Sequence, residues 1–145
     1  MKKLSVIAMM LIMLLVALSS CSDDDNPTNT GISIQGTWDV TEYKYISQAD
    51  PTVTFDFLTE FGASFTMTVS ENGAYTMSGT VQGVPFSFSG NFSEDSNGDI
   101  SADDPNTTVT VTNNTITMVS TDESWDFNED GTDEPANLRV VMTKR

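Results

Sequence analysis

The sequence contains no histidine and only one cysteine in 145 residues. The absence of histidine excludes nucleophiles that are activated by a Ser-His or Cys-His pair, and a single cysteine excludes a disulfide within the chain. Zinc and haem sites of the usual kind are excluded as well, because their protein ligands are mostly histidine and cysteine. Carboxylates, tyrosine and lysine are left for catalysis, and nothing in their spacing directs a pair of them to a pocket. We therefore expect a protein that is not an enzyme.

Positive charge is also scarce, since six Lys and Arg residues stand against 21 Asp and Glu residues, for a formal net charge of −15. Proteins that bind nucleic acid need a cationic surface to displace the counterions of the phosphates. The chain is therefore not expected to bind nucleic acid. Its length of 145 residues is that of one domain of ordinary size.

The chain has one long apolar run, which lies at its N-terminus. Lys2 and Lys3 precede residues 4–18, in which every residue except Ser5 is apolar. A helix of this length measures about 22 Å, which is short for the ~30 Å hydrocarbon core of a bilayer. A basic start followed by a short apolar run is typical of a secretory signal peptide, which we assign to residues 1–20.

The predicted signal peptide is followed by a cysteine, in the sequence Leu18-Ser19-Ser20-Cys21. Small residues directly before a cysteine resemble the lipobox of bacterial lipoproteins. The resemblance implies cleavage before Cys21, acylation of Cys21 and attachment to a membrane through more than one acyl chain, which makes the anchor stable. An ordinary secretory signal with an incidental cysteine is the alternative.

An acidic segment, Ser22-Asp23-Asp24-Asp25, comes directly after the cysteine. It resembles the export tag of surface lipoproteins of the Bacteroidota type. The resemblance implies a lipid-anchored protein of the outer membrane, exposed on the cell surface. The alternative is that the three aspartates only begin a solvated tether. We assign residues 21–33 to a lipidated acidic tether.

Beyond residue 33, apolar and polar residues alternate with the period of a β-strand. The clearest example is a hairpin in which two alternating runs, residues 65–69 and 75–81, flank Asn72-Gly73. Asn-Gly favours a tight turn because both residues tolerate positive φ. A second hairpin is expected around Asn113-Asn114.

About eight such strands are expected in residues 34–145, each with one apolar face and one face of Ser and Thr. We predict an all-β domain, an antiparallel up-and-down meander closed into a small barrel, because closure removes exposed strand edges. A β-sandwich is the alternative. Residues 48–63 are ambiguous. A strand with a wide loop is preferred there, over one short helical turn that carries Phe57, Leu58 and Phe61.

The first expected strand contains the motif Gly36-x-Trp38, and the last contains Arg139. A Gly-x-Trp motif near the start of an all-β chain resembles the opening motif of lipocalins, which belong to the calycin superfamily. Residues 70–76 are similar to a hairpin of small lipocalin-like lipoproteins. The resemblance implies a lipocalin-like barrel in which Trp38 closes one end and Arg139 packs across it.

The domain is short for a lipocalin, so its strands must be short and any cavity small. A barrel of eight strands is filled by its own side chains or holds one small ligand. Six aromatic residues are candidates either to line a cavity or to fill the core: Phe55, Phe57, Phe65, Phe86, Phe88 and Phe92. We expect the barrel to bind a small apolar or amphipathic molecule. A non-enzymatic module that binds a protein or glycan partner is the alternative.

Residues 126–134 match the first half of a calcium-binding loop. Oxygen-bearing residues alternate around Gly131, and the candidate ligands are Asp126, Asn128, Asp130, Thr132 and Glu134. The match fails where Asn137 replaces the bidentate glutamate, so a calcium site would be weak, and a polar hairpin turn is the alternative. A second acidic segment, residues 94–104, is interpreted as a solvated loop. No other cofactor is expected.

Overall fold

The computed structural model describes residues 33–145 of the chain. The predicted signal peptide, the lipidated Cys21 and the acidic residues 22–25 lie outside this range. Within it, the structure consists almost wholly of antiparallel strands, so the predicted all-β class is confirmed. The elements in chain order are β1 (Gly36–Ser47), β2 (Thr54–Asp56), α2 (Phe57–Glu60), β3 (Ser64–Val69), β4 (Ala74–Val81), β5 (Val84–Glu94), β6 (Ile100–Ala102), β7 (Thr107–Thr112), β8 (Thr115–Trp125) and β9 (Glu134–Lys144).

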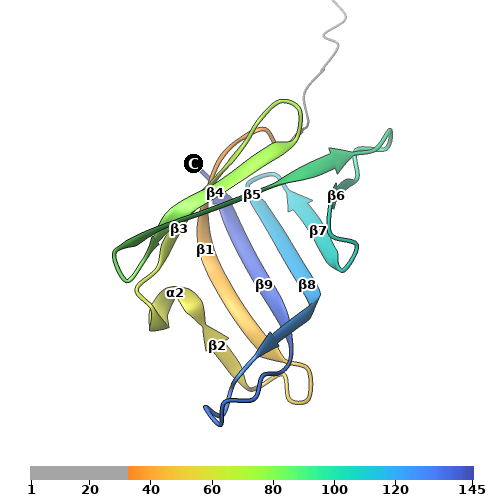
Figure 1. The fold of residues 1–145 in the computed structure, drawn as a ribbon. Coiled ribbons are helices and arrows are strands. Elements are labelled where there is room, and N and C mark those ends of the chain that lie inside the picture. Colours follow the sequence, from red (N-terminus) through yellow and green to blue (C-terminus); the bar gives the residue numbers. More distant parts are fainter. Residues whose placement is uncertain (1–32) are drawn as a thin grey trace, which may run out of the picture.

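The strands form one continuous sheet in the order β6-β5-β4-β3-β1-β9-β8-β7, with the short β2 on β1 outside this path. The long first strand pairs with β3 on one edge and with the last strand, β9, on the other. The eight strands of the path turn 310° round an axis and make a nearly closed barrel (Figure 1). The predicted up-and-down barrel is therefore confirmed, and the sandwich is not formed.

The barrel is incomplete on the side where β5 and β6 approach β7. β6 pairs only with Phe92–Glu94 of β5. Among the described strands, the rest of β5, residues 84–91, is hydrogen-bonded to β4 alone. Within residues 33–145, no strand is paired with the outer edge of residues 84–91. We call this opening, between residues 84–91 of β5 and strand β7, the seam.

Two β-bulges change which residues face the interior. In β1 the register with β9 shifts between Val40 and Glu42, and in β8 it shifts between Ser120 and Glu123. Because side chains alternate between the two faces of a strand, an extra residue reverses the alternation beyond it. The interior residues of β1 are therefore Trp38 and Val40 before the bulge, and Tyr43 and Tyr45 after it.

One end of the barrel is filled by a dense apolar core. Trp38, Met67, Ile116 and Met142 are each at most 2 % exposed, and they come from four strands that are neighbours in the sheet. The indole Nε1 of Trp38 donates a hydrogen bond of 3.0 Å to the carbonyl oxygen of Ile34, which is itself buried. Each fully buried aliphatic side chain of this size contributes about 1.5–3 kcal/mol, so this end holds much of the stability of the fold.

The other end carries β2 and α2. The strand expected within residues 48–63 is therefore formed, as the short β2, but the short helical turn that was its alternative is formed as well, in place of the wide loop. Asp56 starts this turn, because its carboxylate accepts a hydrogen bond of 3.2 Å from the backbone N–H of Thr59. The turn brings Phe57 and Phe61 together, with ring centroids 4.8 Å apart.

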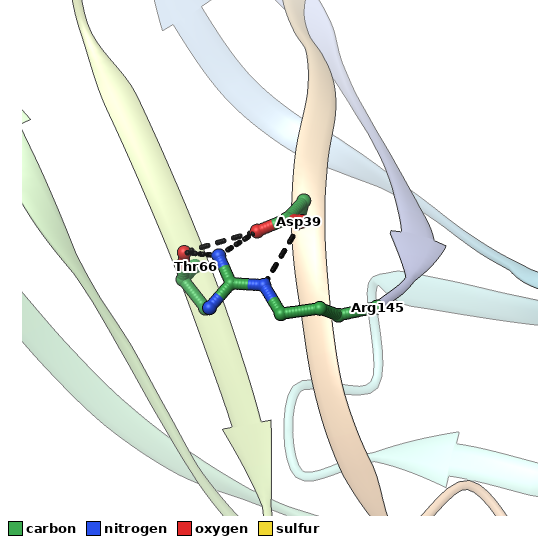
Figure 2. Close-up of polar contacts among 3 residues, drawn as sticks. All are labelled: Asp39, Thr66 and Arg145. Carbon is green, nitrogen blue, oxygen red and sulfur yellow. Dashed lines mark hydrogen bonds and ion pairs between the residues drawn. The ribbon is translucent and has the colours of Figure 1, made fainter.

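The outer face of the sheet is tied across strands by two ion pairs. Arg145, at the C-terminus, reaches over β1 and donates hydrogen bonds to the carboxylate of Asp39 and to the hydroxyl of Thr66 on β3 (Figure 2). Hydrogen bonds from Arg145 hold the pKa of Asp39 below its ordinary value. Arg139 on β9 pairs with Glu42 on β1, with Nη1 2.5 Å from Oε1. Both pairs lie at the surface, where such contacts add little stability.

Candidate ligand-binding site

A cavity of about 360 Å³ lies inside the barrel, beyond the filled end. Its lining comes from both walls, from β4 and β5 on one side and from β1, β8 and β9 on the other. The loop between β6 and β7 and the start of β7 complete it. The lining residues are Tyr43, Tyr75, Met77, Phe86, Phe88, Asp104, Thr107, Met118, Ser120, Glu123, Leu138 and Val140.

The walls of the cavity are mainly aromatic and aliphatic. The ring of Phe88 lies edge-on to Phe86 at 6.0 Å and to Tyr75 at 6.4 Å between centroids. Phe86 in turn contacts Phe65 of the core, at 6.0 Å. Met118 lies on β8 in the opposite wall. Such a lining suits an apolar ligand body, because the rings and the methionines offer large contact areas without polar groups that need partners.

The cavity opens to solvent at the seam. Phe86 and Phe88 face the interior, yet they are 50 % and 37 % exposed. Their exposure follows from the missing strand pairing along residues 84–91, since no neighbouring strand covers them from that side. Asp104 and Thr107 stand on the other side of the opening. A ligand can therefore enter through the wall of the barrel rather than through its closed end.

Polar side chains also line the cavity, and the charged ones among them, Asp104 and Glu123, are both negative. Asp104, at the opening, accepts hydrogen bonds from the backbone N–H of Asn106 at 3.0 Å and from the hydroxyl of Thr107 at 2.8 Å. These two bonds hold the pKa of Asp104 below its ordinary value. Glu123 is half-buried and lines the cavity. Within residues 33–145, its carboxylate is paired with no hydrogen-bond donor and no cation.

Tyr43 lies beside Glu123 in the same cavity. Burial raises the pKa of the Tyr43 phenol well above its ordinary value, and the neighbouring Tyr45 and Glu123 raise it further. Burial also raises the pKa of Tyr45. Both phenols are therefore neutral at physiological pH, and the Tyr43 hydroxyl donates a hydrogen bond to the Tyr45 hydroxyl, a contact that raises the pKa of Tyr43 and lowers that of Tyr45.

The six phenylalanines named from the sequence fall into three groups. Only Phe86 and Phe88 line the cavity. Phe65 and Phe92 are buried, at 6 % and 3 % exposure, and belong to the core. The remaining two, Phe55 and Phe57, join an aromatic cluster at the α2 end of the barrel. This aromatic cluster consists of Tyr45, Phe55, Phe57, Phe61 and Trp125, and Trp125 stacks on Phe55 at 4.4 Å and on Tyr45 at 4.6 Å.

The sequence did not identify most of the cavity lining. Tyr75 and Met77 belong to the apolar face of the hairpin that was predicted, so the alternation could have found them. Tyr43 and Glu123 face inward only because each follows a bulge. The available signal was a switch of apolar residues from even to odd positions, from Trp38 and Val40 to Tyr43 and Tyr45 in the first strand.

The structure places the residues of the Gly-x-Trp motif at the filled end, but it does not bring Arg139 to them. Gly36 has a φ of +138°, which a side chain would strain, and Trp38 is buried beneath Ile34. The register sets Lys144, and not Arg139, opposite Trp38. The Nζ atom of Lys144 lies 5.4 Å from the Trp38 ring centroid, so the expected role of Arg139 is corrected in favour of Lys144. Arg139 faces outward because it follows Leu138, which faces the cavity.

The candidate calcium ligands lie in the loop between β8 and β9, where they close the loop on itself. Asp126 accepts hydrogen bonds from the backbone N–H groups of Asp130 at 3.1 Å and Gly131 at 2.8 Å. Asn128, Asp130 and Glu134 likewise accept from backbone N–H groups, those of Asp130, Thr132 and Phe127. In the part of the chain that the structure describes, no three carboxylates, cysteines or histidines are placed to hold a metal ion. A calcium site at these residues stays a prediction, and the polar hairpin turn stays its alternative.

Comparisons of the chain with models of known protein families, with curated proteins and with solved structures return no match. The architecture, an antiparallel barrel of eight strands that is nearly closed, is consistent with a lipocalin-like fold. Within residues 33–145, no helix has the length and apolar content that a membrane span requires.

Proposed function

We propose that this protein is a lipid-anchored binding protein of the cell surface, whose barrel holds a small apolar or amphipathic molecule. The observation that carries the proposal is the open cavity behind Phe86 and Phe88. An aromatic residue that is half exposed on the inner face of a barrel loses hydrophobic stabilisation unless a ligand covers it. The exposure at the seam is therefore what a binding site would leave in the unliganded protein.

The size of the cavity supports a ligand of modest dimensions. Ligand pockets commonly measure about 300–1,000 Å³, and the cavity, at about 360 Å³, is near the lower limit. It accommodates a body of one or two rings or a short alkyl chain, not a long lipid. The filled end limits its depth, because Trp38 and Met142 occupy the space beyond it.

The location is proposed from the N-terminal sequence, with support from where the domain begins. Ser33 is held at the end of β5, where its backbone N–H donates a 2.6 Å hydrogen bond to Glu94. Ile34 then enters the core beside Trp38. The described part of the chain thus begins at the filled end of the barrel, away from the cavity.

A protein partner is the second candidate, favoured by the same seam. The outer edge of residues 84–91 is unpaired within the described part of the chain, and Val84 is 66 % exposed. An extended peptide could add a strand there. The two candidates differ in what occupies the cavity. A small molecule would fill the interior, whereas a peptide paired with the edge of β5 would leave the interior open to a probe.

Native mass spectrometry of the full protein, extracted under mild conditions, tests the binding of a small molecule. We expect a co-purified species of a few hundred daltons or, with the empty protein, binding of the neutral probe 1-naphthalenemethanol. Ser120→Phe would fill the cavity, since Ser120 is buried in its wall. Ser124→Phe makes the same change at an exposed position of the same strand.

The proposal predicts that Ser124→Phe binds the probe as the wild type does and that Ser120→Phe, if folded by circular dichroism, binds at least tenfold more weakly. Equal binding by both variants would place the probe outside the cavity and contradict the proposal. Absence of any bound species or probe, together with capture of an extended peptide, would favour the second candidate.

The proposed lipid anchor at Cys21 is tested separately. Replacement of Cys21 by serine removes the only residue that the lipobox could acylate, so we expect loss of metabolic palmitate labelling and of the protein from the membrane fraction. Replacement of Asp23, Asp24 and Asp25 by asparagine should retain the label but reduce cleavage by protease added to intact cells. Unchanged cleavage would show that the acidic run is only a tether.

A further inference from the structure

The cavity wall contains acidic groups and no basic ones. Among its lining residues the charged members are Asp104 and Glu123. The four cations of the described residues are placed elsewhere. Arg139 and Arg145 pair with acids on the outer face, Lys144 lies over Trp38, and Lys44 is absent from the lining. The interior field of the cavity is therefore negative.

Glu123 is the carboxylate that contributes negative charge within the cavity wall. It is half-buried, it lines the cavity together with Tyr43, Ser120 and Leu138, and no donor within residues 33–145 satisfies it. A carboxylate that is partly desolvated and unpaired is costly, and a positive ligand group would offset that cost. Its charge is felt by both neighbouring phenols, whose pKa values it helps to raise.

Asp104 places a second negative charge at the entrance. Its two hydrogen bonds, to the backbone of Asn106 and the hydroxyl of Thr107, leave the carboxylate anchored at the seam. A charge at the mouth and one inside attract a cation along the entry path. The same pair repels a carboxylate or phosphate, so a fatty acid fits this lining poorly.

The aromatic walls complete the arrangement. The faces of tyrosine and phenylalanine rings attract cations within about 6 Å when water is excluded. Tyr43, Tyr75, Phe86 and Phe88 line the cavity. The protein already uses this interaction at the filled end, where Lys144 lies over the ring of Trp38.

We propose that the cavity selects organic cations, namely amines or quaternary ammonium compounds with a small apolar body. The cationic group pairs with Glu123, and the body lies between the aromatic walls and Met118. The inference rests on the proposed function, because it names the ligand class for the same cavity. Uncharged molecules of the same shape bind more weakly, and anions more weakly still.

A matched series of probes tests the inference on the unmodified protein. The three probes share the naphthalene ring and differ in charge: 1-naphthylmethylammonium, 1-naphthalenemethanol and 1-naphthoate. Affinities are measured by calorimetry with the full chain in lipid nanodiscs, and empty nanodiscs supply the background. We expect the cation to bind about tenfold or more tightly than the alcohol, and the anion most weakly.

Two variants assign the preference to one residue. Glu123→Gln removes the charge and keeps the shape, so the cation should lose about tenfold in affinity while the alcohol is unchanged. Glu60→Gln makes the same substitution at an exposed position of α2 outside the cavity, and should change neither affinity. The charge series on the unmodified protein stays decisive even if Glu123→Gln does not fold.

The outcomes separate the inference from the function on which it rests. Equal affinities for the cation and the alcohol, or tightest binding of the anion, would overturn the charge selectivity and leave the binding function standing. A preference for the cation that survives Glu123→Gln would overturn the assigned role of Glu123. No binding by any of the three probes would contradict the proposed function, and the inference with it.

Discussion

Tyr43 and Glu123 face the same cavity from two strands that flank β9, and each follows a β-bulge in its own strand. Without the bulge in β1, strict alternation would turn Glu42 and Lys44 inward and Tyr43 outward. The bulges thus convert an ordinary barrel wall into one with phenols and a single carboxylate inside. The chemistry of the cavity depends on these two irregularities.

Deletion of Thr41 removes the bulge and the extra residue together, so it should straighten β1 without turning its residues over. Val40 pairs with Met142 and Glu42 with Val141, so the shortened strand keeps its register with β9 and keeps Tyr43 inward. We expect a loss of about 1–2 kcal/mol in the free energy of unfolding, from the lost bend of the strand, and urea denaturation measures it. Thr41→Ala keeps the bulge and loses only the 3.2 Å hydrogen bond to Val141, so it should cost about 1 kcal/mol or less. A loss above about 3 kcal/mol on deletion of Thr41 would contradict this account of the bulge.

Trp38 should contribute more to stability than any residue of the cavity. Its side chain is 2 % exposed and is hydrogen-bonded to Ile34, so Trp38→Ala should cost about 3–5 kcal/mol. Trp38→Phe keeps most of the ring and should cost about 1–3 kcal/mol, since it leaves the Ile34 carbonyl without its donor. Chemical denaturation of both variants checks the order. A loss under about 1 kcal/mol for Trp38→Ala would show that the filled end is not the core.

The three tyrosines predict how stability changes at alkaline pH. Burial raises the pKa of Tyr43, Tyr45 and Tyr75 above the ordinary value of 10.0. The folded state favours the neutral phenol, so this stabilisation is fully present below about pH 10 and is lost as the pH rises further. Absorbance at 295 nm should therefore show that phenolate forms at a higher pH in the folded protein than in an unfolded chain, and that the last of it forms together with unfolding.

Tyr43→Phe tests the largest part of this effect, because it removes the phenol whose pKa is raised most clearly. The variant should unfold at a higher pH than the wild type while its stability at pH 7 changes little. Titration of all three phenols with an ordinary, unshifted midpoint in the folded wild type would contradict the burial of these side chains.

Gly90 should control the position of Tyr75 in the cavity wall. A Cβ atom at Gly90 would lie 2.6 Å from the Tyr75 hydroxyl oxygen and 2.7 Å from Cζ, so Gly90→Ala must displace the ring. We expect a loss of about 1–3 kcal/mol in stability and weaker binding of 1-naphthalenemethanol. Ser89→Ala, at the exposed neighbouring position, is the control and should change neither quantity. Normal probe binding by Gly90→Ala would remove Tyr75 from the site.

The regular parts of the fold could be predicted from the sequence because local chemistry determines them. Asn72-Gly73 forms the turn between β3 and β4, and Gly73 has the positive φ of 85° that such a turn requires. Asn113-Asn114 separates β7 from β8 at the expected place, although neither residue has a positive φ. The alternation around these turns was sufficient to predict an antiparallel meander and its closure.

The cavity could not be predicted because it depends on long-range pairing. Phe65 and Phe86 belong to similar alternating runs, yet Phe65 is buried and Phe86 is half exposed. The difference lies in their neighbours, since β3 is flanked by β1 and β4 while most of β5 has a partner on one side only. The register of Arg139 and Lys144 is likewise set by the β1–β9 pairing, and sequence position alone does not distinguish which cation reaches Trp38.

The most direct measurement of cavity binding uses the four methionine methyl groups of the described residues, two of which line the cavity. Met77 and Met118 line it, whereas Met67 and Met142, both 0 % exposed, are absent from the lining. Met67 lies opposite Met77 in the β3–β4 ladder, so a weak response is expected there. In a protein labelled with ¹³C at the methionine methyls, 1-naphthalenemethanol should shift the signals of Met77 and Met118 most and that of Met142 least. Equal shifts at all four, or no shift at Met77 and Met118 at saturating probe, would contradict a ligand site in this cavity.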